Sequence, residues 1–182
     1  RSGRARWVGP SLESVLAAWG GAGKATHFAF RGLAPLPLVR RGYHYGLALD
    51  ELSRAGAIVA LAINGEPLPR ARGFPARLVV PGIYGMSHVK WLGRIEGKTA
   101  PHRGIHNRFW FTNQERRNGR WVRVQARWIG LKSLVTRCLR VEGGWLLTGW
   151  AWGGEQGIAG VDVTTDGGRT WRGADGAGPG AL

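Results

Sequence analysis

The chain has 182 residues, of which 43% are hydrophobic and 20% charged, a composition that predicts a folded globular protein with one good core or two small ones. No stretch approaches the roughly 18 apolar residues of a membrane-spanning helix, and the single cysteine, Cys138, excludes an internal disulfide and a cysteine-rich metal site. The formal net charge of +15 is compatible with steering of an anion and with binding to nucleic acid, and does not choose between them.

The first half of the chain mixes helical and strand patterns. In chain order we expect a helix at 11–20, a strand at 26–30, a helix at 47–55 and a buried strand at 57–63. Ser11 is a suitable N-cap for the first helix, and Asp50 and Glu51 lie in the first turn of the second, where the helix dipole favours acidic groups. The apolar run ends at Asn64-Gly65, a favoured hairpin turn.

After Lys98 the helical periodicity fades, and short alternating stretches lie between glycine-rich turns. Strands are expected at 120–128, 145–152 and 158–164, a spacing that predicts a small β-sandwich. Cys138 lies in an alternating stretch and is expected to be a structural thiol. The resulting organisation is an α+β domain at 1–97, a connecting segment at 98–130, an all-β sandwich at 131–175 and a disordered tail at 176–182.

The most informative segment runs from Asn64 to Glu96. It combines an Asn-Gly turn with prolines, glycines and spaced cations, and this composition describes an ordered, turn-rich surface that holds an anion. The cations of the segment that we select are Arg72, Arg77, His88 and Lys90.

Two segments resemble the sulfite oxidase family. In the first, from Asn64 to Glu96, the patterns NG-x-PLP, GFP-x-R, VPG-x-x-G and HVKWL look like the molybdopterin domain of that family. The second, from Gly149 to Trp171, is similar to its C-terminal dimerisation domain, an immunoglobulin-like sandwich. Arg6-Trp7-Val8-Gly9, before the first helix, also fits the family order. The resemblance implies a partial α+β molybdopterin-binding domain followed by an all-β immunoglobulin-like sandwich.

The cofactor that the resemblance implies is molybdenum held by molybdopterin (Moco), a pterin that ends in a phosphate. By the same resemblance, Arg77 lies against the pterin, and its planar fork suits a bidentate contact. His88, Val89 and Lys90 match the triplet that closes round the cofactor, and Arg72 is the fifth cofactor-binding candidate. No catalytic residue and no metal ligand is assigned within this chain.

The pattern also departs from the family. The cysteine that ligates the metal in the family lies upstream of Arg1, and a chain that begins at Arg1, with its only methionine at Met86, is expected to have lost a leader or to be a fragment. Arg72 stands where many relatives have a histidine, and Ala34 stands where some relatives have an aspartate. Animal sulfite oxidases have a tyrosine at the position of 109–111, and no tyrosine occurs there in this chain. These departures predict a divergent, bacterial-type member whose substrate need not be sulfite. The compartment, periplasm or cytoplasm, stays open.

The function implied is oxygen-atom transfer on a small oxyanion, with electrons passed to an external acceptor such as a cytochrome or haem subunit. Arg72, Arg103 and Arg108 are candidates for attracting the anion, and residues 125–175 are expected to form a homodimer. One alternative is a degenerate pterin-binding or dimerisation module without catalysis. Another is a basic nucleic-acid-binding protein, suggested by the aromatic and basic stretches 108–111 and 120–123. We expect no nucleic acid, because the cations are scattered and no recognised motif occurs.

Overall fold

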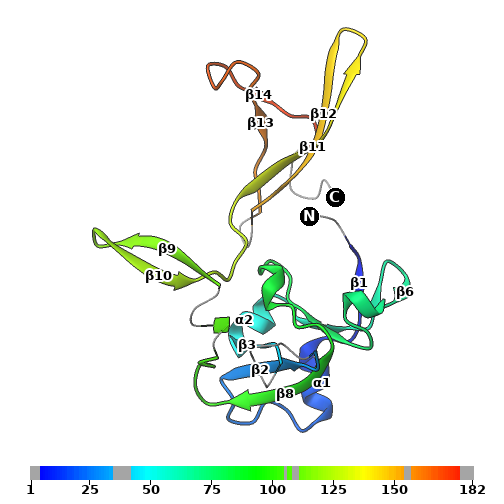
Figure 1. Ribbon diagram of the computed structural model, residues 1–182, viewed down its shortest axis with the longest axis vertical. Helices are drawn as coiled ribbons and strands as arrows, with labels where there is room; N and C mark the ends of the chain where they lie inside the picture. The colour runs from blue at the N-terminus through cyan, green and yellow to red at the C-terminus, as the bar shows by residue number, and fades with distance from the viewer. Residues whose placement is uncertain (1–4, 35–41, 105, 108–110, 154–156, 177–182) are drawn as a thin grey trace. The chain divides into compact units, whose positions relative to one another are not determined.

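The computed structural model describes residues 5–34, 42–104, 106–107, 111–153 and 157–176. The chain divides into two compact units, Arg1–Arg127 and Trp128–Leu182, which are described one at a time (Figure 1). The described residues are mostly β-structure with few helices, and both helices lie in the part that the sequence predicts to be α+β. No helix among them is both long and apolar enough to cross a membrane.

The first unit contains two short α-helices, two 3-10 turns and ten strands in its described residues. In chain order these are β1 (Trp7–Val8), α1 (Leu12–Ala18), β2 (His27–Gly32), β3 (His44–Ala48), α2 (Leu49–Arg54), β4 (Ile58–Ala60), β5 (Ala62–Ile63), β6 (Glu66–Pro67), η1 (Arg70–Arg72), β7 (Arg77–Val79), η2 (Gly85–Ser87), β8 (Leu92–Lys98), β9 (Thr112–Arg117) and β10 (Arg120–Gln125).

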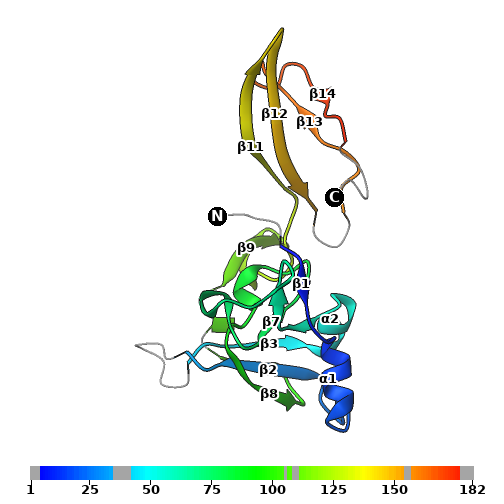
Figure 2. The ribbon, with the colours of Figure 1, turned by 90° about the vertical axis from the view of Figure 1, so that its right-hand side faces the viewer.

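Besides the hairpin of β9 and β10, three small antiparallel sheets occur among the described residues of this unit. Their strand orders are β3-β2-β8, β4-β7 and β1-β5-β6. In Figure 2, α1 runs beside the sheet formed by β2, β3 and β8. The core includes Phe30 and Tyr45, which are directly opposite on β2 and β3 and both fully buried, together with Leu47 of β3 and Leu78 of β7.

The predicted elements of the first half are present with shifted limits. The first helix begins where expected, since the Ser11 hydroxyl accepts a hydrogen bond from the Ser14 N–H at 3.0 Å. The second helix begins at Leu49 rather than at 47, because Leu47 and Ala48 pair with β2 as the end of β3. The apolar run at 57–63 forms two strands with different partners, since β4 pairs with β7 and β5 pairs with β1 and β6.

The hairpin β9–β10 lies in the stretch 98–130 and clusters with the first unit. In the second unit, β11 (Lys132–Val141) pairs with β12 (Gly144–Trp152), and β13 (Asp162–Val163) pairs with β14 (Arg172–Gly173). Many apolar side chains of β11 and β12 are exposed. Cys138 is a free and exposed thiol on β11, and the predicted tail lies outside the described residues except for Gly176.

Candidate anion-binding site

A tight turn brings three of the predicted cations together. The turn η1 ends at Gly73, whose φ of +113° is left-handed. A Cβ on Gly73 would lie 3.1 Å from the Cβ of Arg77 and 3.2 Å from the Cα of Lys90. Glycine therefore meets two needs here, because it adopts the left-handed conformation and lets the loop lie directly against Arg77 and Lys90.

The three carbonyls of η1 accept hydrogen bonds from side chains that follow later in the chain. Arg70 O accepts from Trp91 Nε1 at 2.9 Å, and Ala71 O accepts from Lys90 Nζ at 3.0 Å. Arg72 O accepts from Arg77 Nη1, also at 3.0 Å. The last turn of a helix has carbonyls without intrahelical partners, so these donors hold the turn in place.

Arg77 is a buried cation that has no counter-ion in the part of the chain that the structure describes. Its side chain begins on β7, the residue is 6% exposed, and none of the ion pairs among the described residues includes it. Its Nε is buried without a hydrogen-bond partner, and its guanidinium carbon lies 4.6 Å from the centre of the Trp7 ring. Burial, and then the charge of Arg72, lower the pKa of Arg77. A guanidinium in this state has donors available for an anion.

His88 and Val89 face the interior of the unit. A backbone carbonyl can only accept, so His88 Nε2 donates to Val80 O at 2.9 Å. Burial lowers the pKa of His88, a shift that the bond to Val80 opposes, and the imidazole is therefore neutral near pH 7. Val89 is fully buried, and its carbonyl accepts from Leu78 N at 2.9 Å.

The five predicted cofactor-binding residues thus fall into two groups. In the first group, Arg77 and Lys90 donate hydrogen bonds to carbonyls of η1, the turn that contains Arg72. In the second group, His88 and Val89 form hydrogen bonds with β7 and with the loop after it. Arg72 is exposed and Lys90 is half-buried. Of the other expected cations, Arg103 is exposed and Arg108 lies outside the described residues, as do 109 and 110 of the stretch without tyrosine.

Sequence patterns did not select Trp7, which contacts this site, or Tyr43, which contacts the neighbouring turn η2. Trp7 packs on Arg77 from β1, seventy positions earlier in the chain, and nothing local signals that contact. Tyr43 begins beside β3 and its hydroxyl donates to Met86 O in η2. Burial is the main cause that raises the pKa of Tyr43, which therefore stays a neutral donor.

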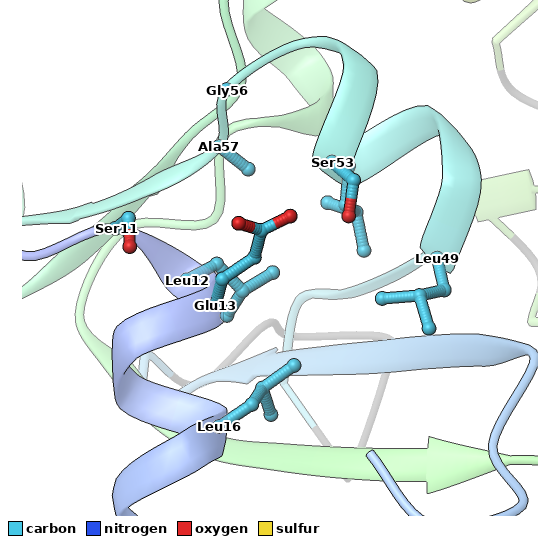
Figure 3. A pocket seen from close by; sticks show the side chains of 9 residues that line it. Ser11, Leu12, Glu13, Leu16, Leu49, Ser53, Gly56 and Ala57 are labelled. Carbon is cyan, nitrogen blue, oxygen red and sulfur yellow. The ribbon is translucent and has the colours of Figure 1, made fainter. Parts of the chain in front are cut away.

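Two other features of the first unit are distinct from this site. A cavity of about 70 Å³ between α1 and α2 is too small for a pterin and contains none of the predicted cations (Figure 3). It is lined by Ser11, Leu12, Glu13, Leu16, Leu49, Leu52, Ser53, Gly56 and Ala57. The rings of His102 and His106 lie 5.1 and 5.2 Å from that of His44, but no group of residues in the described part of the chain has the geometry of a metal site.

Comparisons with known proteins identify the family of the chain. The family model of the oxidoreductase molybdopterin binding domain matches residues 1–106. Mitochondrial sulfite oxidase from Rattus norvegicus is 34% identical over 94% of this chain and 34% of its own length. The NAD(P)H nitrate reductase from Hordeum vulgare is 30% identical over 93% of this chain and 22% of its own length.

A solved structure extends the similarity to the fold. The sulfane dehydrogenase SoxCD from Paracoccus pantotrophus matches with a TM-score of 0.77 at 25% identity, over 93% of this chain and 43% of that chain. The present chain spans about a third of the length of the mammalian sulfite oxidases that it matches. The resemblance to the sulfite oxidase family is confirmed, and this chain belongs to the family of the oxidoreductase molybdopterin-binding domain.

Proposed function

We propose that this chain supplies the pterin-binding residues of a molybdenum oxidoreductase that resembles sulfite oxidase. The observation that carries the proposal is Arg77, a buried guanidinium with an unpartnered Nε and no acidic partner among the described residues. Burying an unpaired charge costs several kcal/mol, so an anion that pairs with it recovers a large free energy. Arg77 also lies inside the segment that the family model matches.

The residues present fit the cofactor of this family, molybdenum held by molybdopterin. Arg77 and Lys90, with the exposed Arg72 beside them, would hold the anionic end of the pterin through charge-assisted hydrogen bonds. His88 and Val89 would keep the β7 loop in the shape that presents those donors. When bound, the cofactor supplies two-electron oxygen-atom transfer, and the protein supplies orientation and electrostatics.

For the whole protein we propose oxygen-atom transfer on a small oxyanion, followed by release of electrons to an external acceptor. The relatives named above are sulfite oxidases, a nitrate reductase and a sulfane dehydrogenase, which supports small sulfur or nitrogen species as the substrate class. Arg72 and Ala34 replace residues of the family pattern, so the substrate need not be sulfite.

We further propose that residues 131–175 belong to an immunoglobulin-like sandwich through which two copies associate. The pairing of β11 with β12 places Leu134, Leu139 and Trp150 on one face, and Cys138, Trp145 and Leu147 on the other. An antiparallel sheet that covers a core needs only one apolar face, and its other face can be solvated. The second apolar face of β11 and β12 therefore supports packing against another copy of the chain. Deleting everything after Arg127 is expected to give a poorly soluble monomer, whereas a soluble dimer by light scattering would contradict the assignment.

The cofactor proposal is tested by expressing the protein from its own gene in a host that makes the molybdenum cofactor. We expect molybdenum and pterin to copurify with the wild type and to be lost from Arg77→Met. Arg94→Met, which removes an exposed arginine of β8, is the matched control and should retain both. Molybdenum and pterin in equal amounts in all three proteins would contradict the assignment of Arg77. Retained cofactor without oxyanion-dependent reduction of ferricyanide would indicate the degenerate module.

A further inference from the structure

The hairpin β9–β10 presents an arginine and tryptophan face that the pterin site does not use. The pairing places Arg116 directly opposite Trp121, and Arg123 directly opposite Gln114, so these four side chains share one face of the ribbon. We call it the Arg–Trp face. All four residues are exposed, and Trp121 is 69% exposed. Figure 1 shows the hairpin as a ribbon of two strands.

The opposite face of the same ribbon has a different character. Val122 and Val124 on that face are half-buried, and Glu115, which also lies there, is paired with Arg117 at 3.0 Å. No acidic residue of the hairpin lies on the Arg–Trp face, and no ion pair among the described residues includes Arg116 or Arg123. The two cations and the indole between them are therefore available to a partner.

One pair of arginines in the hairpin is a like-charge pair. Arg117 lies directly opposite Arg120 across the Asn118-Gly119 turn, and Arg116 is next to that pair. Like charges opposite each other destabilise a two-stranded ribbon, and no third strand among the described residues pairs with this one. Within the hairpin, Arg117 has an acidic partner in Glu115, whereas Arg116 and Arg123 on the Arg–Trp face have no ion pair among the described residues.

We infer that the Arg–Trp face docks an acidic protein surface. Arginine and tryptophan are the residues most enriched at the energetic centres of protein interfaces, whereas lysine is depleted there and does not occur in the hairpin. Carboxylates pair with the guanidinium groups of Arg116 and Arg123, and Trp121 supplies a rigid contact area between them. Two arginines can neutralise about two phosphates, which is a small footprint for binding nucleic acid.

The test uses the full chain, labelled poly-L-glutamate as the acidic probe and a labelled DNA duplex as the competing probe. We expect Arg116→Glu/Arg123→Glu to bind poly-L-glutamate at least about tenfold more weakly than the wild type. The control Arg31→Glu/Arg94→Glu reverses two exposed arginines that oppose each other on β2 and β8, so it has the same net charge and should bind as the wild type does within about threefold.

A further variant separates the contribution of the indole contact from that of the arginine charges. Trp121→Ala should weaken the binding of poly-L-glutamate about threefold without changing its salt dependence, because the indole contributes contact and not charge. If the reversal variant fails to fold, Arg116→Gln/Arg123→Gln replaces it. Equal weakening by the reversal variant and its control would overturn the proposal. A tighter complex with DNA than with poly-L-glutamate, lost in the reversal variant alone, would overturn it in favour of nucleic acid.

Discussion

Replacing Arg77 by methionine separates the cost of burying a cation from the benefit of binding an anion. Methionine retains an apolar stem of similar length on β7 and removes the charge. Two favourable interactions are lost, namely the contact of the guanidinium with Trp7 and the hydrogen bond from Nη1 to Arg72 O at 3.0 Å. The desolvation of a cation that is 6% exposed is relieved at the same time.

These opposing terms are of similar size. The cation–π contact is worth about 0.5–2 kcal/mol, and a hydrogen bond from a charged donor about 1.5–3 kcal/mol. Burial of an ion without a counter-ion costs several kcal/mol. Arg72 is exposed, so water can replace the lost donor at its carbonyl. Without an anion, Arg77→Met should therefore have a free energy of unfolding within about 2 kcal/mol of the wild type, in either direction.

Added anion should then distinguish the two proteins. A ligand at a hundred times its Kd stabilises the folded state by about 2.7 kcal/mol, so saturating phosphate should raise the urea midpoint of the wild type and leave Arg77→Met unchanged. Arg94→Met controls for the general loss of one positive charge. A loss of more than about 4 kcal/mol in Arg77→Met without anion would show that Arg77 is a structural residue. An equal gain from phosphate in Arg77→Met and the wild type would refute the site.

Three further predictions concern the same unit. Burial lowers the pKa values of His88 and His102 below 6.5, so the unfolded chain binds more protons than the folded chain at acidic pH. The urea midpoint should therefore be constant above about pH 6.5 and fall as the pH decreases below it. A midpoint that rises on acidification would contradict this reasoning. Gly73→Ala should destabilise the fold by about 2 kcal/mol, measured by urea denaturation, because its Cβ meets Arg77 in a left-handed residue. Gly65→Ala, with a φ of +89° and open space, is the control and should lose less. Trp7→Leu should lower phosphate affinity in a calorimetric titration by less than Arg77→Met does, since it removes a contact and leaves the charge.

Local signals predicted the elements whose partners are close in the sequence. The cap at Ser11 and the Asn64-Gly65 turn are examples, because a side-chain oxygen or a left-handed glycine acts within a few residues. The limits of other elements depend on partners that are distant in the sequence. Leu47 has a helical pattern but pairs with Phe28 on β2, and the apolar run at 57–63 changes its sheet partner at Leu61. Pattern alone does not contain these pairings.

The same distinction applies to the candidate site: its residue types could be predicted from the sequence, whereas the contacts between them could not. Arg72, Arg77 and Lys90 were selected because the segment from Asn64 to Glu96 resembles the molybdopterin domain of the sulfite oxidase family and because an anion needs cationic partners. Their packing was not predictable, because it depends on η1 carbonyls that accept from Lys90 and Trp91, about twenty positions later. Trp7 was missed for the same reason, since its contact with Arg77 joins β1 to β7.

The side chains that hold η1 and those proposed to bind the anion are partly the same, and the number of their donors explains how both roles are possible. A guanidinium has five N–H donors and an ammonium three. Arg77 and Lys90 each use one donor on an η1 carbonyl. The remaining donors can bind an anion while these bonds persist, so the turn does not have to open. Donors that are already oriented lose little entropy on binding, and anion affinity and loop stability therefore increase together.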